Sequence, residues 1–365
     1  MSIGLRELRR KPLRFGAAGA ALVLLTVLLL LLGGLLDGLY LGSTGALRAQ
    51  QADLITYSAD AKKSLIRSRI DEAERRQVEA VPGVEQVDGL GVALLGANVP
   101  GQSDVASAAV IGYQGGVRGV PDPPAPGRAY ADRRLEAAGV EVGQTLLLGP
   151  QREPLEVVGW VDDTSYLLQG GLWVEPGTWR SILASARPDA TLADGTFQAL
   201  AVTTAPGADP AQVAAAIDGA TGGATTTVTR DDAIAALPGL REQSSTFTSI
   251  IAVTLLVAGL VVALFFALLT LERTGLYGVF KAIGASTGQI FSGVVAQAVV
   301  LGALSFLFGA GAAWLLSLPI PAAVPLQLEP NRVVVTGVAL VAMAVAGSVF
   351  SLRRVVKIDP ASAIG

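Results

Sequence analysis

Four long blocks of apolar residues, separated by more polar segments, dominate the pattern of the chain. They cover residues 15–36, 250–271, 290–316 and 333–352, and none contains Asp, Glu, Lys or Arg. At a rise of about 1.5 Å per residue, each block is long enough as a helix to cross a hydrocarbon core of roughly 30 Å. The pattern therefore predicts four transmembrane helices.

The first block also has the flanks of a secretory signal peptide, because Arg9, Arg10, Lys11 and Arg14 precede it. The apolar core of a signal peptide is about 7–15 residues long, and this block is longer. We therefore expect a retained span, with cleavage as the alternative.

Basic residues gather in three of the segments that flank the blocks. They are Arg6, Arg9, Arg10, Lys11 and Arg14 before the first block, Arg273 and Lys281 between the second and third, and Arg353, Arg354 and Lys357 after the fourth. The positive-inside rule places these clusters in the cytoplasm, so both termini are expected there. Residues 1–14, 272–289 and 353–365 are then cytoplasmic, residues 37–249 form an outer domain, and 317–332 form a short, proline-rich outer loop.

The outer segment alternates between strand-like and helix-like patterns. Strands are expected at 84–95, 145–148, 155–161 and 171–174, and a βαβ-like element at 198–203, 210–217 and 225–228. Helices are expected at 68–80 and 130–138, while 99–127 is expected to form loops around one short strand near Val110, at a subdomain break. The fold class is thus a four-helix membrane protein with an α+β domain inserted between helices 1 and 2. Residues 37–51 and 230–249 would continue the spans outward as stalk helices.

Composition narrows the possible functions. Only 16% of the residues are charged and the net charge is −3, so no basic surplus exists for nucleic acid. The chain has neither Cys nor His, which removes disulfides, thiolate nucleophiles, imidazole bases and the usual zinc ligands. Because no charge lies deep in a span, the intramembrane groups of ion-coupled carriers are also missing, and glycines such as Gly33, Gly34, Gly302, Gly309 and Gly311 are expected to pack helices.

Few side chains suggest chemistry. No phosphate-binding G-x-x-x-x-G-K-[ST] motif occurs, and Gly89 with Gly91 is only a glycine pair beside a strand. The adjacent carboxylates Asp162–Asp163 and Asp231–Asp232 lack further spaced ligands, so we predict turns or helix caps and no metal or other cofactor.

Two further groups have an ordinary and a functional interpretation. Ser58, Lys62, Lys63 and Ser64 could form a Ser–Lys dyad, but the segment is expected to be an exposed connection. Trp160, Trp173 and Trp179 are expected to fill a core, with a hydrophobic binding surface as the alternative. No catalytic residue is predicted, and a membrane-anchored enzyme is the weakest hypothesis.

The connection between the second and third blocks carries a recognisable motif. Its sequence, LERTGLYGVFKAIGAS over 271–286, resembles the cytoplasmic motif R-x-x-E-[IL]-G-[VIL]-[LM]-[KR]-A-[ILV]-G-A-[ST] of FtsX/MacB-like ABC permeases. The matching residues are Arg273, Gly278, Val279, Lys281, Ala282, Gly284, Ala285 and Ser286, while Tyr277 replaces the usual Glu or Gln. Shorter similarities at 5–12, 81–84, 142–146, 155–159 and 357–360 extend the resemblance over most of the chain.

This resemblance implies the permease half of an ATP-driven exporter in the bacterial plasma membrane, with a MacB-like periplasmic core domain and no ATPase of its own. Its partners would be two copies of an ABC ATPase, a second permease copy and membrane lipid. ATP hydrolysis would drive a hydrophobic or amphipathic substrate outward by mechanotransmission. The branch it most resembles exports haem or glycolipid. The alternative is an FtsX-like signal transmitter that regulates a cell-wall hydrolase.

Residues 272–289 would then contain the helix that couples to the ATPase. Leu276, Val279, Phe280 and Ile283 recur every three or four residues, giving one apolar face, and Gly284 is expected to end the helix. The predicted coupling residues are Glu272, Arg273, Leu276, Val279, Phe280, Lys281, Ile283 and Gly284. A helix lying on anionic lipid is the alternative interpretation.

Overall fold

The computed structural model describes residues 12–190, 192–272, 279, 283, 286–321 and 324–352. The chain divides into two compact units. The helical unit consists of Met1–Gly38 and Gln243–Gly365, and the sheet unit is Leu39–Glu242. The inserted domain predicted from the sequence is therefore present as a unit with its own core.

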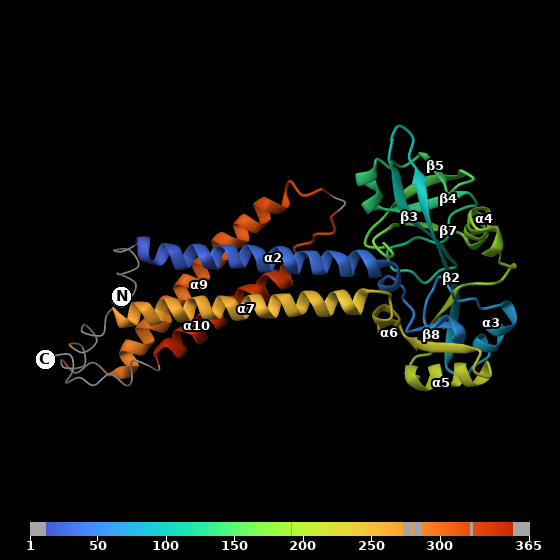
Figure 1. Cartoon of the computed structure of the whole chain (residues 1–365). Coiled ribbons are helices and arrows are strands. Elements are labelled where there is room, and N and C mark those ends of the chain that lie inside the picture. Colours follow the sequence, from blue (N-terminus) through green and yellow to red (C-terminus); the bar gives the residue numbers. More distant parts are fainter. Residues whose placement is uncertain are drawn as a thin grey trace. The chain divides into compact units, whose positions relative to one another are not determined.

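The four apolar blocks form the four long helices α2 (Pro12–Arg48), α7 (Leu240–Leu271), α9 (Thr287–Ser317) and α10 (Pro330–Leu352), which Figure 1 shows. Each contains a stretch long and apolar enough to cross a membrane. As expected for stalks, α2 continues twelve residues past Leu36 and α7 begins ten residues before Ile250.

The ends of two of these helices have local causes. Ser286 caps α9 in a capping box with Gln289, each side chain bonding the other's backbone N–H. Pro330 is the first residue of α10, where its missing N–H costs no helical hydrogen bond.

The sheet unit is built on nine hydrogen-bonded strands in the order β3-β7-β4-β6-β5-β2-β8-β1-β9. An additional pairing of β3 with β2 closes the first six strands into a ring, and β8, β1 and β9 extend from β2. The strands are β1 (Leu54–Ser58), β2 (Val84–Asn98), β3 (Val105–Tyr113), β4 (Arg128–Asp132), β5 (Thr145–Leu148), β6 (Glu153–Val161), β7 (Gly170–Val174), β8 (Ala199–Thr204) and β9 (Thr225–Thr229).

Apolar side chains cover both faces of this sheet. One cluster joins the sheet to α3 (Glu72–Glu79), α4 (Pro176–Ala186) and α5 (Pro210–Ala220) through Val78, Trp179 and Ile217. The other joins it to the end of α2 and to α6 (Arg230–Ala235) through Leu47 and Ile234. Neighbours along β2 alternate between the clusters, since Val92 belongs to the second and Ala93 to the first.

Most of the local predictions for the outer segment are confirmed. The strands at 84–95, 145–148, 155–161 and 171–174 correspond to β2, β5, β6 and β7. The βαβ-like element corresponds to β8, α5 and β9, with β1 lying between the two strands and antiparallel to both.

Three local predictions are wrong. The strand expected near Val110 is present as β3, but it pairs with β2 over nine residues and with β7, so the subdomain break expected in 99–127 is absent. Residues 128–132 form β4, and only Arg133–Ala138 is helical, as a 3-10 turn η2. The helix expected at 68–80 begins at Glu72, because Asp71 caps it and Ile70 pairs with Phe197.

Candidate coupling segment and helix bundle

The predicted coupling segment connects the end of α7 to the cap of α9. Glu272 continues the last turn of α7, its N–H donating to Leu268 O at 3.1 Å. Further along, Ile283 N–H donates to Val279 O at 3.1 Å, the i to i−4 bond of a helical turn. Arg273, Leu276, Phe280, Lys281 and Gly284 lie outside the described residues.

Val279 and Ile283 are both exposed, with 52% and 78% of their surface accessible. Residues four apart on a helical turn lie on the same side. The described part of the segment thus presents two neighbouring apolar side chains on one side, which an apolar docking face requires.

The helical unit has a core of its own, formed by side chains from all four long helices, among them Leu22, Val262, Ala298 and Leu340. Two glycines bring helices close together. A Cβ at Gly309 would lie 2.5 Å from Thr26 Cβ, and one at Gly302 would lie 3.3 Å from Ala344 Cβ. No described atom lies within 4 Å of the Cβ position of Gly311, so this glycine brings no two helices together in the described part of the chain, contrary to expectation.

The loop between α9 and α10 packs against the glycine-rich part of α2. Gln327 N–H donates to Gly34 O at 2.9 Å, and a Cβ at Gly34 would lie 2.9 Å from the Leu328 side chain. A Cβ at Gly38 would overlap the carbonyl group of Pro325. We call this contact of residues 325–328 with Gly34 and Gly38 the loop–helix contact. Gly33 packs against Arg332 in the first turn of α10, which agrees with its predicted role in helix packing.

An ion pair joins α10 to α2, because Arg332 Nε donates to Asp37 Oδ2. The Asp37 side chain is 14% exposed and that of Arg332 36%. A carboxylate as little exposed as that of Asp37 is stable in its charged form mainly when it is paired with a cation. The sequence analysis noted no charge deep in a span but missed this pair, since residues 295 positions apart give no local signal of contact.

The other candidate residues have structural roles. Asp162 pairs with Arg133 at 2.9 Å, Asp163 pairs with Arg48, and Asp232 N–H donates to the Thr229 hydroxyl that caps α6. Within the described residues no three His, Cys, Asp or Glu side chains gather as metal ligands.

The Ser–Lys and tryptophan groups also follow the ordinary interpretation. Ser58 Oγ accepts the N–H of Arg69 at 3.2 Å, and Lys62 is exposed, so no buried lysine activates a hydroxyl there. Trp173 and Trp179 are fully buried in different apolar clusters, which confirms core packing for both. Trp160 is partly buried beneath the guanidinium of Arg133.

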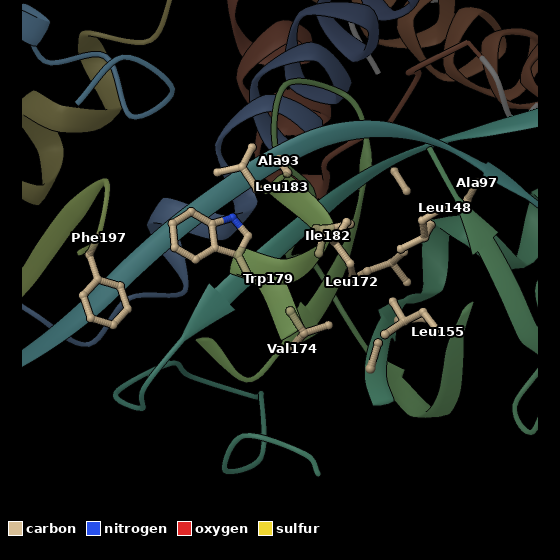
Figure 2. Packing of buried hydrophobic residues seen from close by; sticks show 14 of the residues in the cluster. Ala93, Ala97, Leu148, Leu155, Leu172, Val174, Trp179, Ile182, Leu183 and Phe197 are labelled. Carbon is tan, nitrogen blue, oxygen red and sulfur yellow. The ribbon is translucent and has the colours of Figure 1, made fainter. Parts of the chain in front are cut away.

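Gly89 and Gly91 lie within β2, not beside a strand as expected, and they make room for aromatic side chains. A Cβ at Gly91 or at Gly112 would overlap Trp179, and one at Gly89 would lie 2.5 Å from the ring of Phe197. Figure 2 shows Trp179 and Phe197 in this layer, their rings stacked with centroids 6.4 Å apart. The absence of side chains at these glycines therefore allows Trp179 and Phe197 to pack directly on the strands.

The C-terminal part of the helical unit is similar to known proteins. Residues 248–360 match the family model of the FtsX-like permease C-terminal domain. An uncharacterised ABC transporter permease of Mycobacterium tuberculosis is 38% identical over 143 residues, and HrtB of Staphylococcus epidermidis, whose name describes a hemin transport system permease protein, is 22% identical over 139 residues. Each alignment covers 38% of this chain and 40% of the relative.

Two solved structures resemble part of the chain. The extracellular domain of the noncanonic ABC-type transporter YknZ from Gram-positive bacteria is 15% identical, with a TM-score of 0.34, over 48% of this chain and 98% of that chain. The periplasmic region of MacB from Actinobacillus actinomycetemcomitans is 12% identical, with a TM-score of 0.36, over 51% and 92%.

The structure has four helices long and apolar enough to cross a membrane, as in a multi-pass membrane protein. Residues 248–360, which include most of α7 and the whole of α9 and α10, are similar to the FtsX-like permease C-terminal domain.

Proposed function

We propose that this chain is the permease subunit of an ATP-binding cassette complex that works with a separate ATPase. The observation that carries the proposal is the match over residues 248–360, which includes the whole predicted coupling segment between α7 and α9. The relatives support it, since one is named as an ABC transporter permease and the other as a permease protein of a hemin transport system. The proposed mechanism is mechanotransmission, in which ATPase closure moves the coupling segment and the helices continuous with it.

The proposed arrangement has both termini in the cytoplasm of a bacterial plasma membrane and two permease copies. The distribution of basic residues supports the orientation. On α7, side chains three or four residues apart are 57% to 64% exposed: Val253, Leu256, Leu260, Leu264, Leu268 and Leu271. Lipid or the second copy would cover this apolar stripe.

The proposed substrate is a hydrophobic or amphipathic molecule displaced outward, with haem as the leading candidate. The uncharged spans and the name of HrtB support this choice. Deletion of the gene should lower the minimal inhibitory concentration of haem several-fold. Unchanged tolerance to haem, lipophilic drugs and antimicrobial peptides would favour the signalling alternative.

The coupling segment can be tested by the substitution Phe280→Asp. The new charge would lie in the apolar docking face, where an unpaired carboxylate costs several kcal/mol. We expect stimulated ATP hydrolysis of the complex in lipid to fall at least tenfold while insertion stays normal.

The matched control is Thr274→Asp, which adds the same charge to the opposite side of the predicted helix. This variant should keep most of the activity. Normal partner binding and normal stimulated turnover in Phe280→Asp would show that the segment does not couple the two subunits.

A further inference from the structure

One edge of the long strand β2 is open over six residues. On one side β2 pairs with β3 from Leu90 to Asn98. On the other side it pairs with β8 only up to Leu90, and with β5 only at Ala97 and Asn98. No strand therefore covers residues 91–96 on this side within the described part of the sheet unit.

Backbone groups point into this gap. Val92 N–H donates to Gln198 Oε1 at 2.6 Å, and Gly96 O accepts the N–H of Gly149 at 2.9 Å, so both residues face away from β3. Alternate residues of a strand direct their N–H and C=O to the same side. Leu94, midway between them, must also face the gap, and no described residue forms a hydrogen bond with its N–H there.

A small hollow of about 20 Å³ lies at the gap. Its walls are the four residues Val92, Ala93, Leu94 and Leu95 of β2, with Ile66, Leu183, Gln198, Arg69 and Arg187. Figure 2 shows Leu183 of α4 beside Ala93 of β2. One water-sized group needs about 10–15 Å³ of such volume, so the hollow accommodates a group of only a few atoms.

Two arginines line the hollow, the half-buried Arg69 and the exposed Arg187, and no carboxylate residue is among its walls. Arg69 Nη1 donates only to the carbonyls of Ile66 and Ser68, at 3.0 and 2.7 Å, and neither Arg69 nor Arg187 has an ion pair among the described residues. Nearby Arg75 and Arg180 do have carboxylate partners, Glu79 and Asp194. Burial and then the positive charge of Arg187 lower the pKa of Arg69, as expected for cations without an anion.

We propose that this gap binds the oxyanion group, a phosphate or carboxylate, of a small amphiphile. Arg69, Arg187 and the Leu94 N–H would donate to its oxygens, since guanidinium groups match oxyanions in geometry and charge. The half-buried side chains of Ile66, Leu94 and Leu95 would contact the apolar part. The site is independent of the proposed transport function, because its features belong entirely to the sheet unit.

Binding can be measured by calorimetry on the full chain in nanodiscs of phosphatidylcholine, with empty nanodiscs subtracted. The probes are n-octyl phosphate and inorganic phosphate, with octyl glucoside as the uncharged counterpart. We expect octyl phosphate to bind at least tenfold more tightly than inorganic phosphate, and octyl glucoside not to bind. Arg69→Gln and Arg187→Gln should each weaken octyl phosphate binding about tenfold, and added salt should weaken it further.

Arg118→Gln is the matched control, because Arg118 is an exposed arginine of the same unit outside the hollow. It should bind octyl phosphate like the unmodified chain, and thermal unfolding should show that all three variants fold. Absence of octyl phosphate binding, or binding unchanged in both test variants, would overturn the proposal. Equal affinity for inorganic phosphate would identify a free-anion site and overturn the amphiphile assignment.

Discussion

Single glycines determine how closely the loop after α9 approaches α2. The loop–helix contact places backbone of 325–327 against Gly34 and Gly38. Adding one methyl group at Gly38 would force apart two backbone segments, and overpacking of this kind costs about 1–3 kcal/mol. We expect Gly38→Ala to lower the unfolding temperature of the detergent-solubilised protein by several degrees.

Gly311→Ala supplies the comparison for this variant. No atom lies within 4 Å of its Cβ position, so the change removes a helical glycine without a clash. Replacing a helical glycine by alanine favours the helix by up to about 1 kcal/mol. The Gly311 variant should therefore unfold at or above the normal temperature, and equal destabilisation of both variants would contradict the loop–helix contact.

At the scale of elements, α4 packs on β2 and β3 by placing Trp179 over Gly91 and Gly112. Gly91→Ala should destabilise the sheet unit by about 1–3 kcal/mol, because the methyl group would overlap the indole ring. In a Trp179→Leu background, Gly91→Ala should lower the free energy of unfolding much less, because the indole ring that the methyl group would overlap is absent. Denaturant unfolding followed by circular dichroism gives the four free energies of this double-mutant cycle.

Gly219→Ala is the control for the cycle, because Gly219 lies in α5 with no atom near its Cβ position. It should be neutral or slightly stabilising. If the effects of Gly91→Ala and Trp179→Leu on the free energy of unfolding are additive, the methyl group at position 91 does not overlap the Trp179 ring.

For the whole molecule, the central prediction is the orientation in the membrane. Because the chain has no cysteine, single Cys variants can be labelled without background. We expect an impermeant maleimide to label Ser103→Cys, in the exposed part of the sheet unit, on intact cells. Gly278→Cys and Ala361→Cys should label only after permeabilisation, and the reverse pattern would overturn the orientation.

The sequence by itself determined the features that depend on local pattern. The four long helices follow from uncharged apolar runs, and β5, β6, β7 and the βαβ-like element follow from alternation and turn residues. The coupling segment was found by its motif and three-to-four spacing, and most of its side chains remain predictions because they lie outside the described residues.

Only the tertiary structure decided the features that depend on partners distant in sequence. The sequence predicts a short strand near Val110, but the nine-residue length of β3 depends on the hydrogen bonds that β2 and β7 supply, because the strand is rich in Ala, Ser and Gly, which have weak strand preference. The ion pair of Asp37 with Arg332 and the space for Trp179 likewise join residues far apart in the chain. The open edge of β2 with Arg69 and Arg187 exists only because β8 and β5 each stop short of it, a relation among strands that no single segment encodes.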